Sequence, residues 1–245
     1  MGEAVDLGAA ARSSYDASAE RYVRRSDSSL SNAHYERPMI RSMLPPVAGL
    51  RVLDAGCAGG AHSEWLLEQG ARVIAIDISP KMVELATELT GGRADIRVHD
   101  LREPMSFMGD GSIDVVLSSL SISYVQDLVP VFEEFHRILR ATGVFVLSTH
   151  HPFSDWGWFE LRSYYTVGPV QDHWEEDGVD HVFWRRTVED IIEALHHSGF
   201  VVRRYLEPLP DRALKERFPD APWTDEPVFL FLEAAIDDQR PPDAR

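Results

Sequence analysis

The sequence has only one cysteine, few positive charges and no long hydrophobic run. Each of these shortages excludes a structural feature or a class of partner. Cys57 is the single cysteine of the 245 residues, so no disulfide can form within the chain, which fits a reducing cytoplasm. No apolar run reaches the roughly 18 residues that a transmembrane helix needs. The first residues show no apolar core of a signal peptide. We therefore expect a cytoplasmic protein with no membrane partner.

Positive charge is scarce. Lys and Arg number 24 against 40 Asp and Glu, which gives a formal net charge of −16 at pH 7. Nucleic-acid backbones and anionic membranes bind clusters of Lys and Arg, so we expect no nucleic-acid partner. An acidic surface is compatible with a small or cationic ligand, although it can equally serve solubility alone. The length and the 44% hydrophobic residues suit one domain with a sizeable insertion.

The chain does contain a regular alternation of apolar runs and helical stretches. Seven runs are expected to be strands: 50–54, 71–76, 94–99, 113–118, 143–149, 200–206 and 227–235. Helices are expected at 61–69, 79–89, 127–140, 187–198 and 211–218. Nearly continuous apolar strands that alternate with helices predict an α/β fold whose mostly parallel sheet is covered on both faces.

Polar helices are expected before this alternation, at 9–25 and 33–44, with Pro38 delaying the start of the second or breaking it. At the other end, residues 237–245 read as a polar tail.

The segment 150–186 interrupts the alternation and is rich in aromatic residues. Alternating patterns at 159–166 and 181–186 suggest a hairpin, with turns at 168–169 and 177–178. The segment would rise from the carboxyl edge of the sheet, where open α/β folds bind ligands. Three readings remain open: it walls an acceptor pocket, it forms a contact in a homodimer, or it covers the sheet edge.

The most informative stretch is LRVLDAGCAGG, residues 50–60. A buried strand runs into a turn with Gly56, Ala58 and Gly60 in G-x-A-x-G spacing, which lets backbone approach a ligand closely. This spacing differs from the dinucleotide fingerprint G-x-G-x-x-G. Asp54, just before the turn, would repel a pyrophosphate and attract a cation. The stretch therefore predicts a nucleoside cofactor with a cationic, phosphate-free part, the alternative being an ordinary strand-to-helix turn.

Two more aspartates follow strand ends. Asp77 comes about 20 residues after the turn, where a carboxylate can accept hydrogen bonds from both hydroxyls of a ribose. Asp100 follows the third strand and could accept from the exocyclic amine of an adenine. Each has a simpler reading, Asp77 as the cap of the next helix and Asp100 as a turn former.

These motifs resemble, in order, those of class I S-adenosylmethionine-dependent methyltransferases, especially the small-molecule branch called type 11. The matching stretches are VLDAGCAGG, IAIDIS, VHDL, FMGDGSIDVVLSSLSISYV and HRILRATGVFVLSTHHP. The resemblance implies a Rossmann-like sheet of seven strands with helices on both faces and an antiparallel last strand, 227–235. It also implies an N-terminal helical cap over the cofactor, 1–48, and a methyltransferase domain, 49–236, with 150–186 as an insertion on the substrate side.

The resemblance further implies which residues hold the cofactor. They are Tyr22, Asp54, Gly56, Ala58, Gly60, Asp77, Ile78, Met82, Asp100, Leu101, Ser118, Ser119 and Leu120. The glycine turn would surround the methionine part, the residues from 77 to 101 the adenosine, and those from 118 to 120 the sulfonium. A tyrosine ring beside the sulfonium would gain about 0.5–2 kcal/mol from cation–π attraction, the alternative being simple packing of the N-terminal helices. Ala58 stands where the family usually has glycine, a change that a slightly wider turn should tolerate.

Three residues are candidates for acting on the methyl acceptor. His150 and His151 leave the fifth strand at the expected catalytic edge, and a histidine there could take a proton from a hydroxyl or amine. The alternative is that they orient the turn at Pro152. Tyr124 would position the acceptor. No histidine or acidic pair has a known metal-ligand spacing, so we expect no metal.

The sequence thus predicts a methyltransferase that uses S-adenosyl-L-methionine and releases S-adenosyl-L-homocysteine. Its acceptor would be an O, N or C nucleophile of a small hydrophobic or aromatic molecule. Two alternatives stay open: a protein of this fold that uses the cofactor otherwise, and a nucleotide-dependent oxidoreductase.

Overall fold

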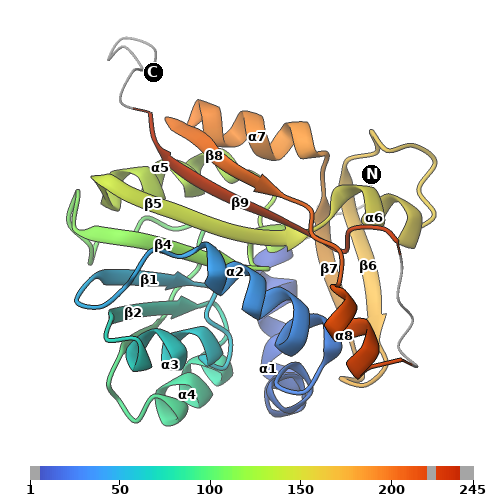
Figure 1. Ribbon diagram of the computed structural model, residues 1–245, viewed down its shortest axis with the longest axis horizontal. Helices are drawn as coiled ribbons and strands as arrows, with labels where there is room; N and C mark the ends of the chain where they lie inside the picture. The colour runs from blue at the N-terminus through green and yellow to red at the C-terminus, as the bar shows by residue number, and fades with distance from the viewer. Residues whose placement is uncertain (1–5, 220–224, 238–245) are drawn as a thin grey trace.

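A computed structural model describes residues 6–219 and 225–237 of the chain, and a seven-stranded sheet lies at its centre (Figure 1). The strands of this sheet are β1 Arg51–Ala55, β2 Arg72–Asp77, β3 Asp95–Val98, β4 Ile113–Ser119, β5 Leu139–His150, β8 Phe200–Leu206 and β9 Phe229–Ile236. The helices are α1 Leu7–Ser26, α2 Arg37–Met43, α3 Ala61–Glu68, α4 Pro80–Leu89, α5 Leu128–Ile138, α6 Pro152–Trp158, α7 Val188–His197 and α8 Arg212–Arg217. A separate hairpin consists of β6 Gly168–Trp174 and β7 Val179–Arg185.

The sheet has the order β3-β2-β1-β4-β5-β9-β8. The first five strands of this order are parallel, whereas β9 runs antiparallel to both β5 and β8. This confirms the predicted Rossmann-like topology with an antiparallel last strand. Because parallel strands end at one edge of a sheet, the loops after β1, β2, β3 and β4 gather there.

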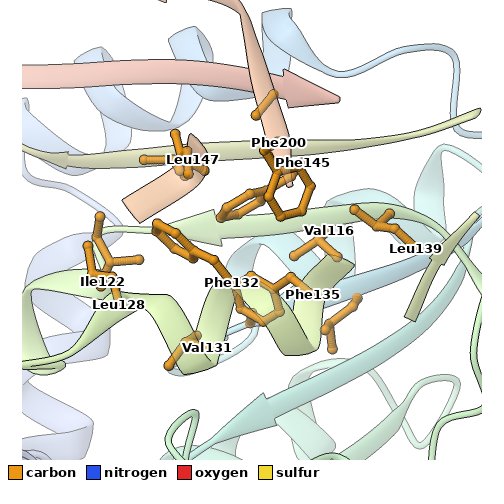
Figure 2. Close-up of a cluster of buried hydrophobic side chains, with 14 of the residues drawn as sticks. Val116, Ile122, Leu128, Val131, Phe132, Phe135, Leu139, Phe145, Leu147 and Phe200 are labelled. Atoms are coloured by element: carbon orange, nitrogen blue, oxygen red, sulfur yellow. The ribbon is translucent and has the colours of Figure 1, made fainter. Parts of the chain in front are cut away.

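The core on one face of the sheet is built around aromatic rings. Helix α5 begins after Asp127, whose Oδ1 accepts a hydrogen bond from the amide of Val129 at 3.1 Å. Its buried face carries Phe132 and Phe135, which pack against Phe145 of β5 at 5.4 and 5.1 Å between ring centres (Figure 2). Burying each such ring contributes about 1.5–3 kcal/mol. A second cluster under α2, α3 and α4 fills the opposite face, so the sheet is covered on both sides as predicted.

The predicted strands and helices of the sheet region are confirmed, with ends that move by one to four residues. The largest shift is in β5, which starts at Leu139 because α5 ends at Ile138. Leu139 pairs with Ile113, and the register then shifts before Val144 pairs with Val115. The predicted helix 33–44 begins as a π-helical turn, Asn32–Glu36, and continues as α2, with Pro38 in the first turn of α2. Neither a late start nor a break occurs at Pro38. The helix instead changes from π- to α-helical hydrogen bonding at Arg37.

The segment 150–186 forms a hairpin, in which β7 confirms the predicted strand at 181–186 but the other strand lies elsewhere. The expected strand at 159–166 is wrong, because turns and irregular backbone follow the end of α6 at Trp158. The expected turn at 168–169 instead begins β6, which pairs with β7 from Gly168 opposite Arg185. The turn at 177–178 is confirmed, with Gly178 at a φ of +66°.

The N-terminal helix α1 lies beside β7 of the hairpin (Figure 1). Of the predicted N-terminal cap, residues 1–5 lie outside the described part of the chain, as does the tail beyond Asp237. Within the two described ranges, no helix is long and apolar enough to cross a membrane.

Candidate cofactor and acceptor site

A cavity of about 1070 Å³, its open mouth included, lies at the carboxyl edge of the parallel strands. Ten predicted residues line it: Tyr22, Gly56, Ala58, Asp77, Ile78, Asp100, Leu101, Ser119, Leu120 and Tyr124. The loops after four strands, together with α1, thus bring most of the predicted cofactor residues to one place.

The turn after β1 approaches its neighbours too closely for side chains. Gly56 has a φ of +85°, and a Cβ there would lie 2.4 Å from the Cβ of Ser121. Ala58 also adopts the left-handed region, with a φ of +45°, which costs a non-glycine residue about 1–2 kcal/mol. The turn keeps the backbone path of a glycine at this position, and Ala58 lines the cavity.

Asp77 holds the glycine turn and faces the cavity at the same time. Its Oδ2 accepts a hydrogen bond from the amide of Ala58 and its Oδ1 one from the amide of Ser79, both at 2.9 Å. Each oxygen keeps a further lone pair for a ligand hydroxyl. Burial raises the pKa of Asp77 to about 6. Asp77 is not the N-cap of α4. That position is held by Ser79, whose hydroxyl accepts a hydrogen bond from the amide of Met82.

Asp100 also combines two roles. Its Oδ1 accepts from the amide of Arg102 at 2.9 Å, as expected of a turn former, and its Oδ2 pairs with the Arg102 guanidinium at 2.6 Å. The residue lines the cavity with its neighbour Leu101.

Four predicted cofactor residues do not line the cavity. Asp54 lies beneath the turn, where its Oδ2 accepts from the hydroxyl of Ser63 at 2.6 Å and burial raises its pKa to about 6. Its Oδ1 has no hydrogen-bond partner among the described residues. Gly60 precedes α3 as its N-cap residue, and Met82 is fully buried in α4. Ser118 is buried and shares a hydrogen bond with the hydroxyl of Ser121. These residues support the lining.

The two histidines after β5 are not brought to the cavity. His151 accepts from the amide of Phe153 at its Nδ1 and lies 2.7 Å from Glu207 at its Nε2. It therefore caps α6, which is the turn-orienting alternative. The ring of His150 packs 5.2 Å from that of Phe183. Because neither residue lines the cavity, the geometry gives no support to a base at either position.

Tyr124 lines the cavity as part of a cluster of tyrosines. Its hydroxyl lies 2.6 Å from that of Tyr15, and the ring of Tyr15 stands edge-on to that of Tyr22 at 5.1 Å. Burial raises the pKa of Tyr15 and of Tyr124 well above 10, so both phenols stay protonated at neutral pH. All three rings line the cavity.

The aromatic hairpin packs behind these tyrosines. Trp174 stacks on Tyr22 at 6.0 Å, and His181 lies 5.0 Å from Tyr15. Among the residues that line the cavity, none comes from 150–186. The segment supports the tyrosines from outside, so the structure does not make it a direct wall of the cavity.

Sequence reasoning missed several polar residues that line the cavity, among them the buried Glu36 and His62. Glu36 ends the π-helical turn before α2, and His62 lies in the first turn of α3. A buried acid between Tyr35 and Arg37 gave no periodic signal, because the register of a π-helical turn differs from that of the α-helix predicted there. Among the residues with described positions, no group of three or more His, Cys, Asp or Glu could hold a metal ion.

Known proteins share this architecture. The family described as "Methyltransferase domain" matches residues 53–147. A solved S-adenosylmethionine-dependent methyltransferase from Mesorhizobium loti is 31% identical, with a TM-score of 0.73 over 86% of this chain and 99% of that chain.

Two relatives named as O-methyltransferases match part of the chain. The ubiquinone biosynthesis O-methyltransferase of Xanthomonas oryzae pv. oryzae is 36% identical over 107 residues, 42% of this chain and 44% of that protein. The malonyl-[acyl-carrier protein] O-methyltransferase of Hamiltonella defensa is 35% identical over 98 residues, 40% of this chain and 37% of that protein. Each match spans less than half of the relative's length.

The matched family covers the strands that carry the glycine turn and Asp77, and the Mesorhizobium protein matches over nearly its whole length. The residues present also fit a nucleoside, since Asp77 keeps open lone pairs at the cavity beside a turn without bulky side chains. The chain therefore belongs to the S-adenosylmethionine-dependent methyltransferases, and its cofactor is S-adenosylmethionine.

Proposed function

We propose that the protein transfers a methyl group to a nucleophile of a small hydrophobic or aromatic molecule. The observation that carries this proposal is the cluster of Tyr15, Tyr22 and Tyr124 in the same cavity as Asp77 and the glycine turn. Rings that line a cavity favour flat apolar ligands. The name of the Xanthomonas relative, a ubiquinone biosynthesis O-methyltransferase, points in the same direction.

The residues of the cavity have separate tasks in this proposal. Asp77 accepts from the ribose hydroxyls, and Asp100 with Leu101 contacts the adenine. The turn from Gly56 to Gly60 and the residues Ser119 and Leu120 surround the methionine part and the sulfonium. When bound, S-adenosylmethionine supplies a methyl group activated by positively charged sulfur. The protein then has to align the acceptor and exclude water.

The N-terminal helix performs the exclusion of water. Tyr15 and Tyr22 of α1 line the cavity, and the helix is held there by the hairpin packed behind it. We propose that residues 6–48 act as the cap over the cofactor, and that Tyr22 lies near the sulfonium, where cation–π attraction of about 0.5–2 kcal/mol is available.

Release of S-adenosylhomocysteine from S-adenosylmethionine tests this function. We expect release that depends on added small aromatic acceptors, and none that depends on peptides or RNA of similar concentration. Binding of the cofactor without release in the presence of any acceptor would favour the alternative, a protein that uses the cofactor otherwise. Release with a macromolecule alone would contradict the small-molecule acceptor.

A further inference from the structure

Glu36 is an acid buried at the floor of the cavity, with only 1% of its surface exposed. Its Oε1 accepts hydrogen bonds from two hydroxyls, that of Ser148 at 2.6 Å and that of Ser119 at 2.9 Å. These two bonds fill the lone pairs of Oε1. Within residues 6–219 and 225–237, no hydrogen bond is made to Oε2. Glu36 therefore offers one open acceptor at the cavity that it lines.

His62 offers a donor next to this acceptor. The guanidinium Nε of Arg41 lies 3.5 Å from the Nδ1 of His62 and can only donate, so Nδ1 accepts. We assign the proton of the neutral ring to Nε2, and burial, which lowers the pKa of His62 well below 6.5, keeps the ring neutral. This Nε2 is buried without a partner in the described chain and lies 3.9 Å from Oε2 of Glu36.

The distance of 3.9 Å is too long for a direct hydrogen bond. A buried donor and a charged acceptor left open side by side are unfavourable, unless a third group joins them. That group has to donate to Glu36 and accept from His62. A hydroxyl does both with one oxygen. A neutral amine, the nucleophilic form in N-methylation, has one lone pair, and a hydrogen bond from His62 would occupy it and leave none to attack the methyl group. A carboxylate has no proton to donate to Glu36.

We propose that Glu36 and His62 bind the nucleophilic hydroxyl of the acceptor, so that the protein methylates oxygen. This proposal rests on the proposed function and narrows its acceptor to phenols and alcohols. Both residues lie close to Ser119 and the glycine turn, where the methyl group is expected. The residues of this pair come from the π-helical turn and from α3, the elements on either side of the turn that holds the cofactor.

The pair also accounts for the proton of the reaction. The acceptor oxygen forms a bond to the methyl carbon, and the carbon–sulfur bond breaks with its electron pair on sulfur. The hydroxyl proton passes to Oε2 of Glu36, which later releases it to water. Burial raises the pKa of Glu36, although its two serine hydroxyls and the nearby Arg37 and Arg41 oppose this, and a raised pKa makes the carboxylate a better proton acceptor.

The test compares Glu36→Gln and His62→Leu with the wild type and with the control Glu68→Gln, an exposed residue at the end of α3. Calorimetry with S-adenosylhomocysteine should give affinities within about threefold for all four proteins. A loss of tenfold or more in Glu36→Gln or His62→Leu would show that the pair binds the methionine part of the cofactor, and would overturn the proposal. Thermal unfolding identifies any variant that fails to fold, and the other variant then decides.

The second measurement is release of S-adenosylhomocysteine with matched acceptors. Each aromatic skeleton in the panel carries a hydroxyl, an amine or a carboxylic acid at the same position. We expect turnover with the hydroxyl compounds alone, with kcat reduced about 100-fold or more in Glu36→Gln, as for loss of a general base. His62→Leu should lower kcat/KM about tenfold by loss of a hydrogen bond to the substrate.

Different results would contradict the hydroxyl site and the proposed function. Turnover with amines or acids, or full activity of Glu36→Gln on phenols, would overturn the hydroxyl site and leave the proposed function intact. Bound S-adenosylhomocysteine with no turnover of any compound would count against both.

Discussion

At the scale of single residues, the turn after β1 holds an alanine where glycine would be unstrained. The φ of +45° at Ala58 costs about 1–2 kcal/mol, while glycine costs about 0.5–1 kcal/mol in lost chain entropy. We expect Ala58→Gly to raise the free energy of unfolding by up to about 1 kcal/mol. Urea unfolding measures this, and Ala17→Gly in the exposed middle of α1 should instead lower it by about 0.5–1 kcal/mol. A destabilised Ala58→Gly would contradict the strain assigned to this position.

Asp54 gives the apoprotein a characteristic pH dependence. Burial raises its pKa from 3.8 to about 6, so the folded protein holds this proton more tightly than the unfolded chain. The resulting stability is complete below pH 4 and is lost as the pH rises through about 6, on the order of 3 kcal/mol for the whole shift. Asp54→Asn cannot titrate at this position and should show a smaller decline, because Asp77, whose pKa burial also raises to about 6, still titrates in the variant.

Urea unfolding of both proteins between pH 4 and 7 checks the prediction. In both proteins Asp77 titrates in the same direction, and His181, whose pKa burial lowers to about 4, titrates in the opposite direction. The difference between wild type and variant therefore reports Asp54 together with its coupling to Asp77. Parallel curves for the two proteins would show that Asp54 does not hold a proton near pH 6.

At the scale of elements, the contact between α1 and the hairpin depends on Asp177. This carboxylate is fully buried and pairs with Arg25 of α1 through bonds of 2.7 and 3.1 Å. The backbone carbonyl of Asp177 also accepts from Arg21, and that of Asp180 accepts from Ser14. The hairpin thereby fixes the helix that carries Tyr15 and Tyr22.

We expect Asp177→Ala to destabilise the protein by about 1–3 kcal/mol. This is less than the 3–5 kcal/mol of a fully buried pair, because Arg25 is 25% exposed. Hydrogen exchange should become faster in α1 and the hairpin, and the affinity for S-adenosylhomocysteine should fall. Glu176→Ala is the matched control, since Glu176 is 78% exposed and lies 3.7 Å from Arg25, and its effect should stay below about 0.5 kcal/mol. Equal effects of the two variants would mean that the buried pair does not hold α1.

The strands of the sheet could be predicted from the sequence because each is an apolar run, and such a run indicates a buried strand. The first strand of the hairpin could not be placed correctly, since β6 begins with Gly168 and Pro169, which indicate a turn, and contains few apolar residues. The position of Glu36 in the cavity could not be predicted from the sequence either. Its side chain lines the cavity because a π-helical turn precedes α2, and no spacing of residues in the sequence predicts such a turn.

At the scale of the whole molecule, the sequence predicted the residues on one side of the cavity but not those on the other. Residues at or after strand ends, such as Asp77 and Asp100, could be predicted from the sequence to lie close together, because parallel strands end at one edge of a sheet. The opposite side comes from α1 and the π-helical turn, and its bonds, such as Tyr15 to Tyr124, join residues far apart in the sequence. His150 and His151 also follow a strand end, yet packing around α6 and β9 turns them away from the cavity.

Calorimetric titration of S-adenosylhomocysteine into wild type, Asp77→Ala and Asp95→Ala tests the central claim most directly. Asp95 is an exposed acid of β3 that pairs with Arg97 and does not line the cavity. Losing charge-assisted hydrogen bonds of about 1.5–3 kcal/mol predicts a 10- to 100-fold weaker affinity for Asp77→Ala, and Asp95→Ala should bind like the wild type. Failure of the wild type to bind S-adenosylhomocysteine, or equal affinities of wild type and Asp77→Ala, would contradict the assignment of this cavity as the cofactor site.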